Sequence, residues 1–521
     1  MKRDSTQRIR RAAIRLAAAV LLSLVVYGLL QIPARQPGYA AAAGPAAVVF
    51  RDGKPVLVNN ADGYCLPLAE GAAVDFSRAE AGVSVTWPDR TLDIYVEPLN
   101  GIRAATYIDY SKRFLKEDPV HHVLDKKYAE PLCGGMLAVT AWHRQRLSRV
   151  ENDHHYYTCL DIVRSARVYT LLLKTDCAVS RAEVEALRAG LICYRPTAAA
   201  APVQIGGGSG PKNEEALALC DAMFGDGADF TWGFYSPDAP YTLSTVRQIE
   251  ERLDCKFRFL MMYSDLKPVY DPDAVAVPLQ TAWDDGRIVM LTLQAQSAAE
   301  VYGVLDGEYD GFLREYAKAV ADFGHPVLLR LFNEMNGDWC GYNGRNTSMD
   351  PSLFRALYSY VTGFFRKAGA DNILWVWNPN ERAYPQFRWN HMSMYYPGEG
   401  CDLYGITGYN TGTYYTGEAW RSFEAIYAPI LADAEMRCSC PILITEFSCS
   451  DFGGDKAAWI TDMFAHIEEY PRLCAAVWWN GTDYAADGTV ARQYRIDHNE
   501  DYLSAFRAGL SRQRRTGESP P

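Results

Sequence analysis

The chain has 521 residues, of which 49% are hydrophobic and 12% aromatic, so it is long enough for several domains and can bury a large core. Its formal net charge of −11 argues against the phosphate backbone of a nucleic acid as a partner and fits a neutral polymer better. The 13 cysteines are scattered and lack the repeated two-residue spacing of metal-binding pairs, so we predict neither a metal site nor a cofactor.

The first 45 residues have the pattern of a secretory signal. Basic residues between Lys2 and Arg15 precede an apolar run at residues 16–30, and small residues follow at 40–43. A basic start, a short apolar run and small residues for cleavage are typical of exported proteins. The run is slightly shorter than the ~20 residues that a full span needs, and an uncleaved N-terminal membrane anchor is the alternative. We therefore expect an extracellular or cell-surface protein.

Two small modules are predicted to follow this segment. Residues 46–98 should form an all-β module, in which Asp52-Gly53 marks a hairpin turn between two apolar runs. Residues 99–197 should form an α+β module, in which Ser180 and Glu183 form a capping box at the start of a helix. Neither module shows paired acids at strand ends, so we predict no catalytic residue in them.

A glycine- and alanine-rich stretch, residues 198–213, is predicted to be a linker to the largest domain, residues 214–510. In that domain, strand patterns alternate with helical patterns, which is the signature of an α/β fold of the (β/α)8 TIM barrel type. The predicted strands cover residues 230–235, 257–263, 288–294, 327–332, 373–377, 403–409, 442–447 and 475–479. Residues 511–521 are predicted to be a disordered tail.

The fourth and seventh predicted strands each lead into a glutamate. Glu334 follows the strand at 327–332, and Glu446 lies near the end of the strand at 442–447. Because active sites of such barrels lie at the carboxyl ends of the strands, both acids are expected at one mouth. Retaining glycosidases use two carboxyl groups about 5–5.5 Å apart, and we predict this separation here. Taken alone, each glutamate is also compatible with a structural role, as a solvated turn residue or a salt-bridge partner.

Aromatic residues end two other predicted strands. Tyr409 closes the sixth strand, where it can hydrogen-bond and orient a carboxylate, and Trp479 closes the eighth, where it can stack on a sugar ring. The alternative for such aromatic residues is packing in the core.

Taken together and in this order, several motifs resemble glycoside hydrolase family 26, whose best-known members are endo-β-1,4-mannanases. The likeness covers most of residues 205–510, and its carriers are Asn333-Glu-Met-Asn-Gly-Asp-Trp339, Trp375-Val-Trp-Asn-Pro-Asn380, Tyr395-Tyr-Pro-Gly398, Tyr404-Gly-Ile-Thr-Gly-Tyr-Asn410, Leu443-Ile-Thr-Glu-Phe447 and Val477-Trp-Trp-Asn480. The resemblance implies that Glu334 is the acid/base and Glu446 the nucleophile. It further implies that Tyr409 hydrogen-bonds the nucleophile and that Trp339 and Trp479 bind sugar.

The sequence departs from the family's mannanases at two positions. Asn333 stands where they usually place a histidine, and Gln294 or Gln296 stands where they usually carry another near the end of strand three. In the wider clan of barrel glycosidases, an asparagine before the acid/base contacts the 2-hydroxyl of the sugar. That hydroxyl is axial in mannose and equatorial in glucose, so the polymer is left open.

We therefore expect an exported, monomeric, retaining β-glycanase that hydrolyses a β-linked polysaccharide and resembles endo-1,4-β-mannanases. A β-1,3/1,4-glucanase or xylanase on the same barrel is the alternative enzyme. A non-catalytic protein that binds wall polysaccharide is the alternative outside enzymes. For Glu334 to act as an acid at neutral pH, burial and the nearby Glu446 must raise its pKa.

Overall fold

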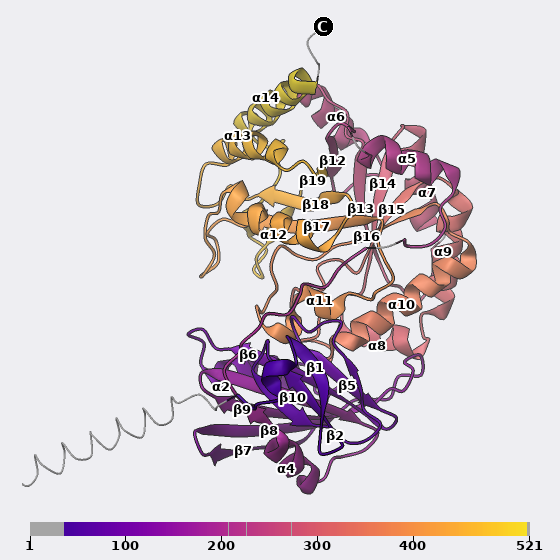
Figure 1. The fold of residues 1–521 in the computed structure, drawn as a ribbon. Helices are drawn as coiled ribbons and strands as arrows, with labels where there is room; N and C mark the ends of the chain where they lie inside the picture. The colour runs from indigo at the N-terminus through magenta and orange to yellow at the C-terminus, as the bar shows by residue number, and fades with distance from the viewer. Residues whose placement is uncertain (1–35, 207, 226, 272, 518–521) are drawn as a thin grey trace, which may run out of the picture. The chain divides into compact units, whose positions relative to one another are not determined.

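The computed structural model describes residues 36–206, 208–225, 227–271 and 273–517, which form two compact units (Figure 1). The first unit contains the chain up to residue 146 together with residues 154–201, and the second contains residues 147–153 and the chain from residue 202. The apolar run of the predicted signal or anchor lies outside the described residues. Ala40–Ala42, placed near the predicted cleavage site, form a short 3-10 turn (η1) with Ala40 buried. No helix in the described part of the chain is both long and apolar enough to cross a bilayer.

The first unit contains two antiparallel sheets. The smaller sheet has the order β1-β2-β3-β11, with β1 (Ala46–Arg51), β2 (Lys54–Asn59), β3 (Tyr64–Pro67) and β11 (Ile192–Cys193). The larger sheet has the order β4-β5-β6-β10-β9-β8-β7, with β4 (Ala73–Asp75), β5 (Val83–Trp87), β6 (Arg90–Pro98), β7 (Val123–Leu132), β8 (Gly135–His143), β9 (Tyr156–Arg164) and β10 (Arg167–Thr175). Three helices complete the unit, α2 (Ala104–Ser111), α3 (Phe114–Glu117) and α4 (Arg181–Gly190), the last with the predicted capping box.

The predicted boundary at residue 98 does not separate two modules in the structure. Strand β6 pairs with β10 along its whole length, and β3 pairs with β11, so each sheet uses strands from both sides of the boundary. The two sheets share one core that contains Leu57, Leu92, Leu137 and Leu171. Strands from both predicted modules contribute side chains to this core, so the two modules form one folded unit.

The second unit contains a closed barrel of eight strands in chain order, each parallel to its neighbours. Its strands are β12 (Thr231–Tyr235), β13 (Phe259–Asp265), β14 (Ile288–Gln294), β15 (Val327–Leu331), β16 (Ile373–Trp377), β17 (Leu403–Asn410), β18 (Ile442–Cys449) and β19 (Leu473–Trp479). The predicted TIM barrel is therefore confirmed, and the strand bounds differ from the predicted ones by at most two residues.

Helices surround the barrel (Figure 1). They are α5 (Glu214–Phe224), α6 (Ser244–Leu253), α7 (Asp273–Asp284), α8 (Ala298–Asp306), α9 (Asp310–Phe323), α10 (Pro351–Ala368), α11 (Met392–Tyr395), α12 (Phe423–Arg437), α13 (Lys456–His466) and α14 (Glu500–Gly517). Short 3-10 turns η2 (Arg388–Asn390) and η3 (Ile467–Glu469) and a hairpin, β20 (Thr482–Tyr484) with β21 (Val490–Gln493), complete the unit.

The longest helices have clear end signals. In α10, the side chain of Asp350 caps the first turn, Pro351 occupies its first position, and Gly369 ends it in the left-handed conformation with φ 71°. Helix α14 continues to Gly517, so the predicted disordered tail from residue 511 is wrong for its first residues. The reason is that this segment is rich in good helix formers, and Gln513 accepts a hydrogen bond of 2.7 Å from the indole of Trp232.

Side chains fill the barrel interior in an apolar layer below its mouth. The layer includes Met261, Met290, Leu328, Leu374, Val376, Leu403, Leu443 and Val477, which come from successive strands and are all buried. Above Leu328 on the same face of β15 stands Arg330, two residues further along the strand and fully buried. The interior therefore changes from apolar to charged toward the carboxyl ends of the strands, where polar chemistry begins.

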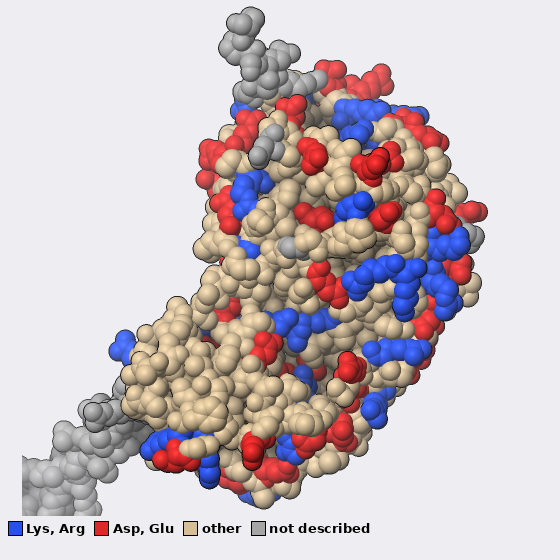
Figure 2. Space-filling view, turned by 45° about the vertical axis from the view of Figure 1, so that its right-hand side comes forward, with Lys and Arg blue, Asp and Glu red and all other residues tan. Residues whose placement is uncertain are grey.

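Charged side chains are intermingled on the face of the molecule seen in Figure 2. Neither sign of charge covers that face, and a large part of it carries uncharged side chains.

Candidate active site

An unusual turn carries Glu334 away from the line of β15. The strand ends at Leu331, and both Phe332 and Glu334 adopt left-handed backbone conformations, with φ 49° and 54°. For residues other than glycine this costs about 1–3 kcal/mol each and persists only where neighbouring contacts enforce it. The backbone N–H of Glu334 donates to the carbonyl of Asn378 at 2.7 Å, and the carbonyl of Glu334 accepts from Gly337 at 2.8 Å. These bonds fix the backbone of Glu334 at the end of β15.

Buried asparagines hold the rest of this turn. Asn343 donates from Nδ2 to the carbonyl of Met335 at 2.7 Å and to Oδ1 of Asn390 at 2.8 Å. Asn390 in turn donates to the carbonyl of Asn336 at 2.9 Å, and Asn336 donates to the carbonyl of Asn380 at 3.0 Å. Because side-chain amides supply both donors and acceptors, they satisfy backbone groups that a strained turn leaves without regular partners.

A bulge aims Glu446 at the barrel mouth. The pairing of β17 with β18 shifts register at Ile406/Thr407, so that Ile406 faces Ile444 and Thr407 faces Glu446. Under strict alternation Glu446 would share the face of Ile444 and point away from the interior. The extra residue of a bulge reverses the alternation, and Phe447 packs instead against Trp478 on the neighbouring strand. Glu446 thereby lines the same pocket as Glu334.

Two side chains hold the carboxylate of Glu446. Nη1 of Arg330 lies 2.6 Å from its Oε2, and the hydroxyl of Tyr409 donates to its Oε1 at 2.5 Å. The guanidinium is also anchored, since Nε donates to Thr292 at 2.9 Å and Nη1 donates to Asn378 at 3.1 Å. A buried cation and a hydroxyl donor thus fix the position of this carboxylate and place positive charge beside it.

Glu334 has the opposite surroundings. Burial, followed by the charge of Glu446, raises its pKa to about 7. Asn380 donates to its Oε1 at 2.7 Å, and Asn333 donates to its Oε2 at 3.3 Å. The amide of Asn380 and the indole of Trp339 oppose the rise by stabilising the carboxylate. Glu334 therefore exchanges its proton near neutral pH, as an acid/base group requires.

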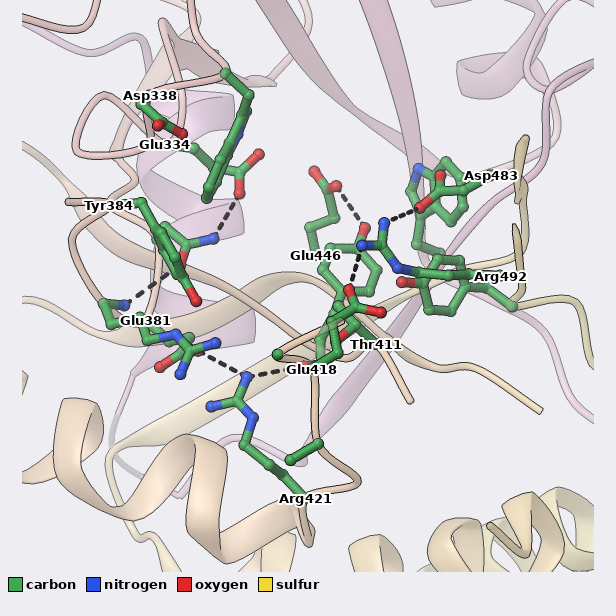
Figure 3. A pocket seen from close by; sticks show the side chains of 18 of the residues that line it. Glu334, Asp338, Glu381, Tyr384, Thr411, Glu418, Arg421, Glu446, Asp483 and Arg492 are labelled. Atoms are coloured by element: carbon green, nitrogen blue, oxygen red, sulfur yellow. Dashed lines mark hydrogen bonds and ion pairs between the residues drawn. The ribbon is translucent and has the colours of Figure 1, made fainter. Parts of the chain in front are cut away.

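Both glutamates line one pocket of about 800 Å³ at the barrel mouth (Figure 3). Three further predicted site residues, Trp339, Tyr409 and Trp479, line it as well. Trp339 is half exposed, with 52% of its surface accessible, and so presents a face for stacking. The structure thus brings together five of the six predicted site residues.

The sixth, Asn333, is buried and is not part of the pocket lining. Its amide contacts Glu334, and its carbonyl accepts from the hydroxyl of Tyr342 at 2.6 Å. A direct contact of Asn333 with sugar stays a prediction. The two glutamines at the end of strand three, Gln294 and Gln296, are not part of the pocket lining either. Both donate to Asp265, at 3.1 and 2.7 Å.

Three aromatic rings pack against the indole of Trp479. Its ring stacks on Tyr235 with centroids 5.2 Å apart and meets Tyr409 and Tyr494 edge-on, at 6.1 and 5.5 Å. Three aromatic neighbours hold the indole plane in one orientation, which lowers the entropic cost of stacking on a sugar.

Sequence reasoning missed a set of ion pairs around the pocket. Arg421 donates to Glu381 at 2.8 Å, and Arg492 donates to Asp483 at 3.0 Å (Figure 3). Arg492 also pairs with Glu418. These residues lie on loops after the strands and in the β20–β21 hairpin, where no periodic pattern marks them. Arg330 had a signal, since a lone charge in a buried apolar strand needs a partner of opposite charge.

A closed (β/α)8 barrel with two glutamates from different strands in one pocket at its carboxyl end defines a glycoside hydrolase domain. Burial and the charge of Glu446 raise the pKa of Glu334 to about 7, whereas Glu446 is held by an arginine, so the two carboxyl groups have different surroundings. Residues 271–448 match the family model of Glycosyl hydrolase family 26.

Comparison with curated proteins and solved structures gives three further likenesses. The chain is 29% identical over 281 residues to Endoglucanase H of Acetivibrio thermocellus, which covers 51% of this chain and 29% of that protein. It is 34% identical over 100 residues to a mannan endo-1,4-beta-mannosidase of Bacillus subtilis, which covers 18% of this chain and 25% of that protein. An endo-beta-1,4-mannanase double mutant of Cellulomonas fimi aligns with a TM-score of 0.46 and 17% identity, over 59% of this chain and 76% of that one. The chain thus spans less than a third of the length of either curated relative.

Proposed function

We propose that this chain is an exported, retaining β-glycanase that hydrolyses a neutral β-linked polysaccharide, with β-1,4-mannan as the first candidate. In the first step Glu446 attacks the anomeric carbon while Glu334 protonates the leaving glycosidic oxygen. In the second step Glu334 acts as the base on a water molecule that releases the sugar from Glu446. Export rests on the sequence pattern of the first 45 residues.

The proposal is carried by the contrast between the two glutamates in one pocket. Glu334 has a pKa raised to about 7, so it is protonated in part of the population at neutral pH. Glu446 accepts a hydrogen bond from Tyr409 and pairs with Arg330, so one of its oxygens stays fixed by a neutral donor and the other by a cation. An acid and a positioned carboxylate are the two parts that a double displacement needs. Once Glu446 forms its ester bond, its negative charge disappears, and Glu334 becomes a stronger acid that can lose its proton and act as base.

The charges around the pocket support a neutral polymer. Six acidic side chains line it, Glu334, Asp338, Glu381, Glu418, Glu446 and Asp483, against three arginines, Arg382, Arg421 and Arg492. This excess of negative charge disfavours polysaccharides built from uronic acids or carrying sulfate. Trp339 and Trp479 offer apolar faces to sugar rings, which is how proteins commonly bind uncharged saccharides.

The choice of polymer is tested by measuring the release of reducing ends from mannan, mixed-linkage β-glucan and xylan. We expect the highest rate on mannan, and β-glucan stands second because one relative is named an endoglucanase. Glu446→Ala serves as the inactive control. Binding of a polymer with no release of reducing ends from any of the three would instead support a non-catalytic binding protein.

The mechanism is tested separately from the polymer, by following the first-formed product of an active substrate by NMR. Retention of the anomeric configuration is expected, because the proposed covalent bond to Glu446 requires two inversions. Inversion would contradict the double displacement, but it would not contradict the assignment of the domain to the glycoside hydrolases.

A further inference from the structure

Three cysteines meet at the end of the barrel opposite to the pocket. Cys401 lies just before β17, and Cys438 and Cys440 lie just before β18, so all three stand at the amino ends of their strands. Their sulfur atoms all lie within 4.8 Å of one another. Cys401 and Cys438 are buried, and Cys440 is partly buried. This cluster, which we call the three-cysteine site, plays no part in the proposed hydrolysis.

The sulfur spacing fits coordination of a metal ion better than a covalent bond. Sγ of Cys401 lies 3.8 Å from Sγ of Cys440. A disulfide holds its sulfurs about 2.05 Å apart. Two thiolates bound to one tetrahedral zinc ion at about 2.3 Å each are roughly 3.8 Å apart, by the geometry of the tetrahedron. The separation of Cys401 and Cys440 is therefore too long for a disulfide and is compatible with two ligands around a shared ion.

Gly206 leaves open the space beside these sulfurs. A Cβ atom at this position would lie 3.2 Å from Sγ of Cys440 and 3.6 Å from Sγ of Cys438, and the φ of 125° further favours glycine. The hydroxyl of Tyr396 accepts a hydrogen bond of 3.0 Å from the N–H of Gly206, and Ile205 forms a β-bridge with Cys438. The middle of the predicted linker, at Ile205 and Gly206, is thus attached to the barrel beside the three-cysteine site.

The backbone around the sulfurs is held by donors. The N–H of Cys440 donates to Sγ of Cys438 at 3.1 Å. Arg472 donates from Nη2 to the carbonyls of Cys438 and Cys440, at 2.5 and 2.7 Å. Supporting contacts of this kind orient thiolate ligands, and the guanidinium places positive charge near a site that becomes negative when three thiolates gather.

We propose that Cys401, Cys438 and Cys440 bind one zinc ion as thiolates. Each thiol releases its proton to solvent on binding, no electron is transferred, and the fourth position of the tetrahedron is taken by a small ligand such as water. The ion links the start of β17, through Cys401, to the start of β18, through Cys438 and Cys440, so its role is structural. This proposal differs from the sequence-based expectation of no metal site, which rested on cysteine spacing along the chain, where Cys401 is distant from the Cys438-Ser-Cys440 pair.

The test uses the full chain, purified under reducing conditions and loaded with zinc chloride, with unbound metal removed. Native mass spectrometry should show one zinc ion per chain, and X-ray absorption at the zinc edge should show three sulfur neighbours at about 2.3 Å, a measurement that needs no variant. Cys401→Ser should bind zinc at least tenfold more weakly. Cys220→Ser is the matched control, since this half-buried thiol on α5 lies in the same unit but outside the site.

Three results would overturn the proposal. One is a chain that retains no zinc while all its thiols are free. Another is zinc that Cys401→Ser and the control variant retain equally well. The third is a disulfide between two of the three cysteines, detected by peptide mass spectrometry in protein purified without reductant, because it would leave one thiol and no metal site.

Discussion

The guanidinium of Arg330 lies 2.6 Å from the carboxylate of Glu446, and both side chains are buried in the barrel. Removing two charges from water is costly, and their mutual attraction repays this cost only where the geometry is good and further hydrogen bonds are made. Here Thr292 and Asn378 accept from the guanidinium and Tyr409 donates to the carboxylate. These contacts together hold the carboxylate of Glu446 in one position at the barrel mouth.

Replacing this arginine should impair both folding stability and the first chemical step. Arg330→Met leaves Glu446 buried without its cation, and breaking a buried pair in this way costs about 3–5 kcal/mol. The variant also loses one of the two contacts that fix the Glu446 carboxylate, so kcat/KM on an aryl glycoside, which reports the attack of Glu446, should fall. Denaturant unfolding measures the first effect and initial rates the second.

Arg330→Lys is the control, because it keeps the charge but loses the planar fork that reaches three acceptors. It should lie between the wild type and Arg330→Met in both measurements. An Arg330→Met variant whose kcat/KM is unchanged would show that the ion pair acts on stability alone.

The alkaline limb of the pH–rate profile should report the titration of Glu334. Its pKa of about 7 lies above the usual value, and the acid form is needed in the first step, so kcat/KM should fall as pH rises through about 7. Asn380 donates to the carboxylate of Glu334 and thereby lowers this pKa. Asn380→Ala should shift the alkaline limb to higher pH.

The shift must be judged against a variant that leaves the Glu334 carboxyl untouched. Asp265→Asn suits this purpose, since Asp265 lies at the carboxyl end of β13, contacts Gln294 and Gln296, and is not part of the pocket lining. An alkaline limb that moves downward in Asn380→Ala would contradict the assignment of this limb to Glu334.

The barrel and its pair of glutamates could be predicted because short apolar strands and helical periodicity repeat clearly from residue 230 onward. That pattern locates the carboxyl ends of the strands, and these ends predict that Glu334 and Glu446 lie at the same mouth of the barrel. The orientation of Glu446 could not be predicted. It depends on a register shift between β17 and β18, which adds no recognisable signal to the sequence.

Long-range pairing limited the prediction of the first unit. Strand β6 was predicted in one module and β10 in another, yet they are neighbours in one sheet. Sequence periodicity identifies a strand and its buried face but not its partner, because pairing depends on contacts between distant residues. The same limit hid the proximity of Cys401 to Cys440.

A chain that begins near Ala201 should keep its activity on a small, soluble oligosaccharide. Every residue that lines the pocket lies between Glu334 and Tyr494, within the second unit. Circular dichroism and thermal unfolding establish that the shortened chain is folded, and the initial rate then gives the test. Residues 147–153 belong to the second unit and are removed by this truncation. We therefore expect the shortened chain to have a lower melting temperature than the full chain.

A version that carries the Glu446→Ala substitution in the shortened chain sets the background rate. Folded but inactive shortened protein, with the full chain active under the same conditions, would show that the first unit completes the active site.

Glu446→Ala should abolish the turnover of every substrate, because no covalent bond to the enzyme can form without this carboxylate. Azide, a small anionic nucleophile, should restore part of the activity by attacking from the vacated side. The product would then be a glycosyl azide of inverted configuration, identified by NMR. A Glu446→Ala variant that hydrolyses mannan or another glycan at the wild-type rate would remove Glu446 from the mechanism.

Glu334→Ala should affect substrates according to their leaving groups. The variant loses general acid catalysis, which contributes roughly 10²–10⁴-fold, so polysaccharide hydrolysis should fall by about this factor. An aryl glycoside with a nitrophenolate leaving group needs no proton, and its first step should stay fast. The second step should be slow, because the base that activates water is also missing. Stopped-flow absorbance should therefore show a burst of nitrophenolate equal to the enzyme concentration, followed by slow turnover. Equal losses on both substrates without a burst would show that Glu334 is not the acid/base.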